Sequence, residues 1–158
     1  MKKVKDLMNR HVFFVKPHHS IYDVARVFAK SEISGAPVVD GGRVVGVLSL
    51  SDIVSFMGLK LAESEVIPHE PNSLSMLILN LIKLGKDYSE FKKELDRISK
   101  FTVKDVMSKE VVFINPDSDL FEAANIMDKY DVNRLPVIDD GKLIGVISRA
   151  DLIKALID

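Results

Sequence analysis

An internal repeat without gaps constrains the fold of this chain more than any other feature of its sequence. When the 158 residues are shifted against themselves by 99 positions, residues 4–57 align with residues 103–156, and 17 of the 54 aligned pairs are identical. Self-similarity at a fixed spacing indicates one structural unit that occurs twice. We therefore expect a first repeat over 1–57, an inserted segment over 58–102 and a second repeat over 103–158.

Both repeats show the same order of apolar runs and turn residues. Residues 12–15 and 111–114 are short β-branched and aromatic runs, followed by Pro17 and Pro116, which predicts a first strand in each repeat. Two more strands follow, each pair joined by an Asp/Gly sequence that is typical of a hairpin turn. They are expected at 36–39 and 44–48 in the first repeat, and at 135–138 and 143–147 in the second.

Two helices are expected in each repeat. Ser20 and Asp119 are N-cap residue types, and each has an acidic residue three positions later. Apolar residues then recur with helical spacing: Ile21, Val24, Ala25 and Phe28 in the first repeat, and Leu120, Ala123, Ala124 and Met127 in the second. A second helix is expected from Ser51 and from Ala150. Each repeat thus reads β-α-β-β-α, an α+β unit.

One such unit has too small a core to be stable alone. We expect the two repeats to pack with pseudo-twofold symmetry into one domain with a cleft between them. The inserted segment predicts a loop at 68–72, a helix at 73–84 and a second helix from Tyr88. It is expected to form a helical hairpin packed on the core or on a partner. Six basic and four acidic residues over 83–100 make a nucleic-acid-contacting helix less favoured.

Composition removes several classes of function. The net charge is −1, which gives no overall attraction to nucleic acid or to an anionic membrane, and no apolar run is long enough for a membrane span. The sequence contains no cysteine, so disulfides and thiolate chemistry are excluded. We expect a cytoplasmic protein without a targeting segment. No nucleotide-binding glycine loop or catalytic motif is present, so no enzyme is predicted. The adjacent His18 and His19 lack further ligands nearby in sequence, so no metal site is predicted.

The motif with most chemical content is Gly-x-x-Ser-x-x-Asp, which occurs at 46–52 and at 145–151. It places a hydroxyl and a carboxylate where a strand ends and a helix begins. Helix N-terminal N–H groups attract phosphate, and a carboxylate can accept hydrogen bonds from a ribose diol. The same spacing is also that of a helix capping box, with Asp in place of Glu. Both explanations are compatible with a motif that is present twice.

These elements together resemble CBS domains, a family named after cystathionine β-synthase. The resemblance rests on Val-Lys-Asp-x-Met at the start of each repeat, on the x-x-Pro-Val strand and on the Gly-Val-x-Ser-x-x-Asp turn, and it covers about two-thirds of the chain. It implies a tandem pair that binds adenosine-containing ligands such as AMP, ADP, ATP or S-adenosylmethionine. It also implies a homodimer that regulates another protein, without a required cofactor and without catalysis.

The resemblance also implies specific ligand contacts. Asp52 and Asp151 would each hold a ribose, while Ser49, Ser51 and Ser148 would face phosphate. The family uses residues of one repeat to complete the site of the other. The site of Asp151 would thus take its base pocket from His11, Val12, Ile33 and Ser34, and the site of Asp52 from Glu110, Val111, Val132 and Asn133.

The second repeat carries more positive charge near its motif. Arg134 and Arg149 align with Gly35 and Leu50 of the first repeat, and arginine can hold phosphate through paired donors. We expect a phosphorylated ligand to bind more tightly at the Asp151 site; alternatively, both arginines are solvated surface charges. Two other functions remain open: a homodimeric interaction scaffold with vestigial pockets, and a nucleic-acid-binding regulator that uses the inserted segment.

Overall fold

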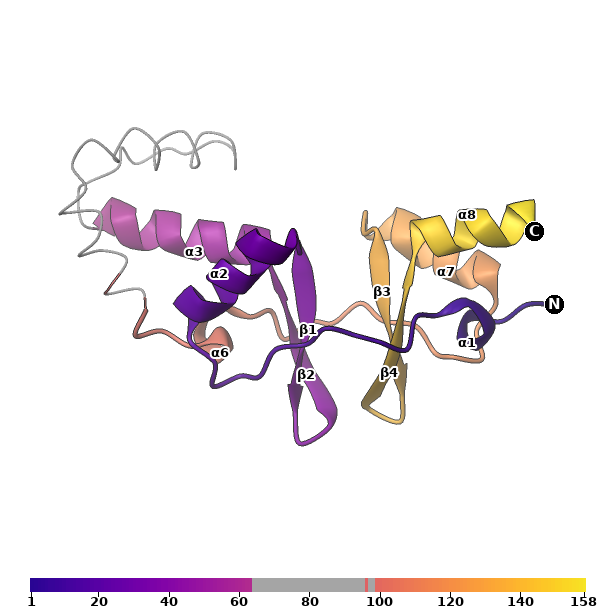
Figure 1. The fold of residues 1–158 in the computed structure, drawn as a ribbon, viewed down its shortest axis with the longest axis horizontal. Coiled ribbons are helices and arrows are strands. Elements are labelled where there is room, and N and C mark those ends of the chain that lie inside the picture. Colours follow the sequence, from indigo (N-terminus) through magenta and orange to yellow (C-terminus); the bar gives the residue numbers. More distant parts are fainter. Residues whose placement is uncertain (64–95, 97–98) are drawn as a thin grey trace. The chain divides into compact units, whose positions relative to one another are not determined.

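The computed structural model describes residues 1–63, 96 and 99–158 (Figure 1). The loop predicted at 68–72 and the two helices predicted at 73–84 and from Tyr88 lie outside the described residues. The first repeat contains α1 (Val4–Leu7), α2 (Ile21–Ser31), β1 (Gly35–Asp40), β2 (Arg43–Ser49) and α3 (Leu50–Glu63). The second contains α6 (Val103–Val106), α7 (Leu120–Lys129), β3 (Arg134–Asp139), β4 (Lys142–Ser148) and α8 (Arg149–Ile157).

The α+β class and the duplicated helix–hairpin–helix order are confirmed. The hairpin turns form because two consecutive residues adopt positive φ in each: 57° and 81° at Gly41 and Gly42, and 49° and 78° at Asp140 and Gly141. This backbone is that of the tight turns favoured in hairpins. The strands form one four-stranded sheet in the order β1-β2-β4-β3. β3 and β4 pair antiparallel along their whole length, whereas β2 meets β4 only at Arg43 and Lys142.

The prediction of a first strand in each repeat was wrong. Residues 12–15 and 111–114 are extended, but each makes a single parallel bridge, Val15 with Val38 and Ile114 with Val137. The reason is the distribution of prolines. A parallel ladder on either side of Val15 would need N–H donors at positions 17 and 37, and both are proline. Pro116 and Pro136 have the same effect around Ile114.

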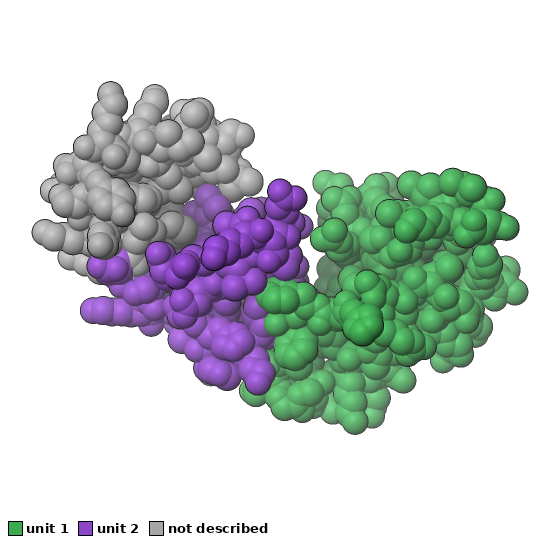
Figure 2. Space-filling view, viewed as in Figure 1, with its two compact units in different colours: residues 1–14, 39–46, 109–158 green, residues 15–38, 47–108 purple. Residues whose placement is uncertain are grey.

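The described chain divides into two compact units, and each unit contains parts of both repeats (Figure 2). Unit 1 comprises residues 1–14, 39–46 and 109–158, and unit 2 comprises residues 15–38 and 47–108. The short opening helices are therefore exchanged: α1 of the first repeat lies in unit 1, and α6 of the second repeat lies in unit 2. The repeats predicted from the sequence are stretches of similar sequence, whereas the two units are groups of residues that contact one another, so their boundaries differ.

Each unit has its own apolar core. In unit 2 the core residues are Val15, Ile21, Val24, Phe28, Ala36, Val38, Leu48, Ile53 and Val103. In unit 1 they are Val4, Met8, Ile114, Ala123, Met127, Leu135, Val137 and Ile147. Val4 and Val103 are fully buried and occupy equivalent positions in the two repeats, so the exchange of opening segments is part of both cores.

Two predicted helix details differ from the structure. Asp119 caps α7 as expected, accepting a 2.8 Å hydrogen bond from the N–H of Glu122. The hydroxyl of Ser20 does not cap α2 but donates to the carbonyl of Ser99 at 3.2 Å, because the segment before α6 runs beside it. On α7, Ala124 is exposed, and Ile126 packs against the core instead. The apolar face of that helix is therefore rotated from the predicted one.

Candidate ligand-binding turns

The two copies of the Ser-x-x-Asp motif form closely similar turns. In the Ser49 turn (residues 49–52), the N–H of Ser49 donates to Asp52 Oδ2 at 3.0 Å, and the N–H of Asp52 donates to Ser49 Oγ at 3.0 Å. In the Ser148 turn (residues 148–151), the equivalent distances are 2.8 Å and 3.3 Å. Both turns are thus reciprocal capping boxes at a helix start, as one of the two explanations of the motif predicts.

The capping box alone does not identify a ligand site, because the chain contains two more. The side chains of Asp6 and Asp105 accept the N–H groups of Lys3 and Thr102 at 2.8 Å, at the starts of α1 and α6. Those two carboxylates are exposed, whereas Asp52 and Asp151 are half-buried at the end of a strand. The Ser49 and Ser148 turns therefore differ from ordinary caps in burial and in their place in the fold.

Each of the two turns keeps acceptor capacity for a ligand. The hydrogen bonds of Asp52 and Asp151 within the described residues use Oδ2, and Oδ1 takes none. One N–H at each helix start is already used, because Leu50 donates to the carbonyl of Ser34 at 2.8 Å and Arg149 to that of Asn133 at 3.0 Å. Each turn therefore offers an acceptor for a ligand hydroxyl, whereas it has fewer N–H donors left for a phosphate group.

The same backbone hydrogen bonds place other predicted site residues. Ser34 lies beside the Ser49 turn in unit 2, and Asn133 lies beside the Ser148 turn in unit 1. The segment before His11 runs along β4, because Asn9 and Val146 exchange backbone hydrogen bonds of 2.8 and 2.9 Å. Unit 2 contains Asp52, Ser49, Ser51, Ile33 and Ser34. Unit 1 contains Asp151, Ser148, Arg149, Val132, Asn133, Arg134, His11, Val12, Glu110 and Val111.

Within unit 2, Ser34 thus lies beside the turn that contains Asp52, and Ile33 precedes it in sequence. Within unit 1, Val132 and Asn133 are bonded by Arg149 of the turn that contains Asp151. The pairing of each aspartate with base-pocket residues of the other repeat stays a prediction. His11 and Val12, which were predicted for the Asp151 site, do lie in the same unit as Asp151.

The two arginines of the second repeat have different surroundings. The side chain of Arg134 is exposed and makes no hydrogen bond or ion pair with any described residue. The guanidinium of Arg149 donates from Nη2 to the carbonyl of Met127 at 3.1 Å and from Nε to that of Val132 at 3.3 Å. This contact was missed from the sequence. The sequence gives only a weak signal for this contact, because Arg149 approaches the end of α7 only once the β3–β4 hairpin has folded.

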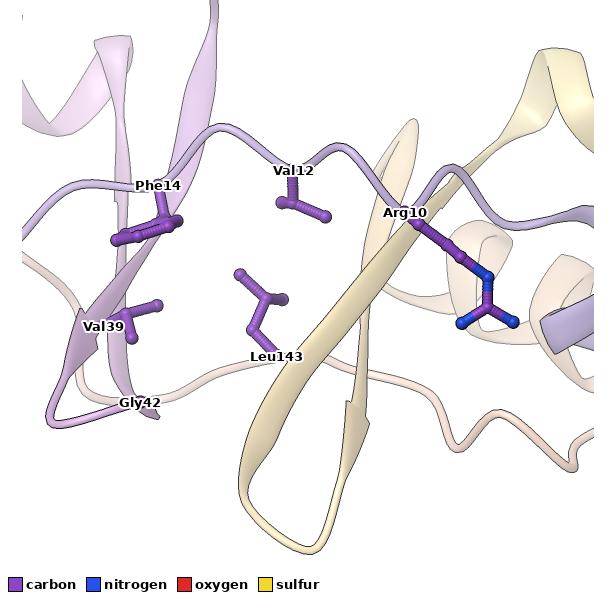
Figure 3. Close-up of a pocket in the computed structure, with 6 residues that line it drawn as sticks. All are labelled: Arg10, Val12, Phe14, Val39, Gly42 and Leu143. Atoms are coloured by element: carbon purple, nitrogen blue, oxygen red, sulfur yellow. The ribbon is translucent and has the colours of Figure 1, made fainter.

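Unit 1 also contains a hollow that the motifs did not indicate (Figure 3). It is open to solvent on one side, has a volume of about 230 Å³ and is lined by Arg10, Val12, Phe14, Val39, Gly42 and Leu143. The side chains of Val12, Phe14, Val39 and Leu143 point toward one another, and the guanidinium of Arg10 points away from them. The sequence signal for it was that residues 10, 12 and 14 of an extended segment share one face, since side chains alternate in direction along such a segment. Of these residues, only Val12 was predicted for a site.

The described part of the chain contains neither a helix that could span a membrane nor a cluster of metal ligands. No helix there has the length and apolar character needed to cross a membrane. No group of three His, Asp or Glu side chains there is arranged to hold a metal ion.

Comparison with known proteins agrees with the duplicated architecture. The family model described as "CBS domain" matches residues 4–58 and 103–158. An uncharacterized protein of Methanocaldococcus jannaschii, MJ1426, is 39% identical over 156 residues, which are 98% of this chain and 90% of that protein. The CBS domain-containing protein YhcV of Bacillus subtilis is 26% identical, over 96% of this chain and 84% of YhcV.

A solved structure gives the same result at the level of the fold. CBSX2 of Arabidopsis thaliana, crystallised in complex with AMP, superposes with a TM-score of 0.67 at 25% identity, over 99% of this chain and 97% of that one. The family match covers more than half of the sequence, and the fold agrees with it. This chain belongs to the CBS-domain family and carries one CBS domain on each side of residues 59–102.

Proposed function

We propose that this protein is a regulatory module that binds an adenosine-containing ligand at the Ser49 and Ser148 turns. AMP, ADP, ATP and S-adenosylmethionine are the ligands that fit the proposal. The observation that carries it is a half-buried aspartate at each turn, with one oxygen held in the cap and the other without a partner among the described residues. In the proposed complex, that oxygen would accept a ribose hydroxyl. The crystal complex of CBSX2 with AMP supports this ligand class for a relative.

The proposed role of each residue follows from its donor and acceptor groups. Asp52 and Asp151 would accept ribose hydroxyls, and the hydroxyls of Ser49, Ser51 and Ser148 would face the phosphate side of the ligand. Arg134 would supply a cation to a phosphate group. Gly35 occupies the equivalent position in the first repeat. A phosphorylated ligand would therefore bind more tightly at the Asp151 site.

Substitution of aspartate by asparagine tests this proposal while keeping the cap. In Asp151→Asn the amide oxygen can still accept the N–H of Ser148, but the other group becomes an NH₂ donor that cannot accept a ribose hydroxyl. A hydrogen bond to a charged group contributes about 1.5–3 kcal/mol, so affinity should fall by roughly 10- to 150-fold. Asp52→Asn should have the same effect at the other site. Isothermal titration calorimetry with the four ligands measures both.

Asp105→Asn is a matched control, because it makes the same change in a capping box that lies outside the proposed sites. Its ligand affinity should equal that of the wild-type protein. If the wild type binds none of the four ligands, or if Asp105→Asn weakens binding as much as Asp151→Asn does, the proposed function is wrong.

Regulation of an unidentified partner protein, assembly as a homodimer, a cytoplasmic location and the lack of catalysis belong to the same proposal. A homodimeric scaffold with vestigial pockets is the second candidate. It is favoured by the exposure of apolar side chains on α7 and α8, where Phe121, Leu156 and Ile157 are 77%, 85% and 79% exposed. Large exposed apolar side chains of this kind are common at protein interfaces when they form a contiguous patch. Sedimentation equilibrium measures the dimer; a monomer at all concentrations would contradict the scaffold.

A further inference from the structure

Arg149 links two chain segments that are far apart in sequence. Its backbone N–H donates to the carbonyl of Asn133 at 3.0 Å, and its guanidinium donates to the carbonyls of Met127 and Val132. The first residue of α8 thereby holds the end of α7 and the connection from α7 to β3 at three points. All the atoms concerned lie in unit 1.

The connection that Arg149 holds has two unfavourable features of its own. Asp131 adopts a left-handed conformation with φ of 51°, which disfavours a residue other than glycine. Its carboxylate also follows the C-terminus of a helix, where the helix dipole favours cations. The Arg149 guanidinium supplies the favoured cation at this helix end, on the Met127 carbonyl, and also binds the Val132 carbonyl just after Asp131. The Met127 carbonyl accepts a second hydrogen bond, of 3.0 Å, from the backbone N–H of Val132 at the end of the helix.

The first repeat provides an internal comparison. The equivalent backbone bond from Leu50 to Ser34 is present at 2.8 Å, and Glu32 adopts the equivalent left-handed conformation with φ of 53°. The leucine side chain has no hydrogen-bond donor, so the residue at position 50 cannot bind the carbonyls at the end of α2 as Arg149 binds those after α7. The backbone geometry therefore forms without an arginine, and the side-chain clamp is particular to the second repeat.

We propose that Arg149 is a positioning residue, whose guanidinium fixes the connection that carries Val132, Asn133 and Arg134, and that it does not act as a phosphate ligand. The proposal rests on the ligand-binding role of these three residues in the proposed function. Its own geometric basis is that Nε and Nη2 form one fork across two carbonyls, an arrangement that a single ammonium group cannot reproduce. The residue thus sets the shape of the site and leaves phosphate recognition to Arg134.

The test combines amide exchange with two ligands that differ only in the phosphate group. In Arg149→Leu without ligand, we expect the Val132 amide to exchange with deuterium on the order of tenfold faster, as expected for two lost hydrogen bonds. Affinities for adenosine and for AMP should fall by the same factor, as measured by calorimetry. Arg149→Lys keeps the charge but not the fork, so its effects should match those of Arg149→Leu.

Lys154→Leu is the control, since it removes one positive charge from the same helix at an exposed position that makes no side-chain hydrogen bond to a described residue. It should leave both exchange and affinity unchanged. A loss of AMP affinity with normal adenosine affinity, restored in Arg149→Lys, would show that Arg149 contacts phosphate and would overturn the proposal. Unchanged exchange at Val132 in Arg149→Leu would also overturn it.

The two proposals fail in different ways. If the wild type binds neither adenosine nor AMP, the proposed function is wrong, and exchange in the ligand-free variants still decides whether Arg149 holds the connection. If the wild type binds AMP and Arg149→Leu exchanges and binds normally, the clamp is wrong and the proposed function stands.

Discussion

Replacement of Gly145 by alanine tests the exchange of opening segments between the two repeats. Gly145 is a buried residue of β4, and an added Cβ would lie 2.6 Å from Sδ and 3.0 Å from Cγ of Met8, and 3.1 Å from the carbonyl oxygen of Asn9. Met8 follows α1 and is 9% exposed in the core of unit 1. The clash therefore falls on a segment of the first repeat that packs against a strand of the second.

The magnitude follows from the ways in which the clash could be relieved. Met8 cannot turn away without repacking the core, and overpacking of this kind costs about 1–3 kcal/mol. The alternative is that the segment withdraws from β4, which sacrifices the two backbone hydrogen bonds between Asn9 and Val146 at about 1 kcal/mol each. Either way, we expect Gly145→Ala to lower the free energy of unfolding by about 2 kcal/mol.

A double-mutant cycle identifies Met8 as the cause. Met8→Ala alone should destabilise by about 2–5 kcal/mol, because it empties part of the core. The same change removes Sδ and Cγ, so the double variant should be more stable than the sum of the single effects predicts by about 1–2 kcal/mol. Urea unfolding followed by far-ultraviolet circular dichroism measures all four proteins. Gly35→Ala is a control, since its nearest contact would be 3.3 Å, and its effect should be smaller.

Additive effects in this cycle, or a Gly145→Ala variant as stable as the wild type, would refute the reasoning. In either case the contact of Met8 with Gly145 would not be close enough to fix the segment. The packing of α1 in unit 1 would then rest on the burial of Val4 and on backbone hydrogen bonds, and not on the contact of Met8 with Gly145.

Two further predictions concern helix α7 and the surface ion pair. Asp119→Ala should destabilise the protein by about 1 kcal/mol, because it removes a made N-cap bond. Urea unfolding measures this loss, and an unchanged stability would contradict the prediction. Ser20→Ala removes the bond from its hydroxyl to the Ser99 carbonyl and no cap bond, so amide exchange in the first turn of α2 should not change; faster exchange there would contradict this. Lys5 Nζ bonds Asp117 Oδ1 at 2.7 Å, and this hydrogen bond and the charge lower the pKa of Asp117 and raise that of Lys5. The lowered pKa of Asp117 makes a small contribution to stability, which is present above its unfolded-state pKa and is lost as the pH falls through its folded-state pKa. The raised pKa of Lys5 has the opposite dependence: its contribution is lost as the pH rises through its folded-state pKa. Nuclear magnetic resonance titration of Asp117 should show its pKa return upward in Lys5→Ala; an unchanged value would remove the ion pair as the cause.

Local sequence signals predicted the parts of the fold that local chemistry determines. The hairpins were found because Gly41, Gly42 and Gly141 allow positive φ, and because the strands have a buried face. The starts of α3 and α8 were predicted to within one residue. The prediction of a first strand in each repeat was wrong, because it followed the β-branched composition and neglected that Pro37 and Pro136 lack the backbone N–H donors that a ladder needs. A strand needs partners as well as propensity.

Contacts that join distant segments could not be predicted from the same signals. Ser20 has the right position for a cap, but its hydroxyl donates a hydrogen bond to the carbonyl of Ser99, a residue 79 positions away. Nothing in the pattern around Val4 indicates that it packs in a core formed mainly by residues of the second repeat. Both cases involve a choice between a local and a distant partner, and local periodicity contains no information about the distant one.

The duplicated turns show how one backbone can support two different chemistries. The backbone bonds from Leu50 to Ser34 and from Arg149 to Asn133 are equivalent, as are the capped carboxylates of Asp52 and Asp151. These features depend on main-chain geometry, so any residue other than proline at position 50 or 149 is compatible with them. The side chain at that position can therefore change without loss of the turn, and in the second repeat it has acquired a contact with the preceding helix. Sequence differences between the two turns should accordingly be concentrated at such positions, where the backbone geometry does not depend on the side chain.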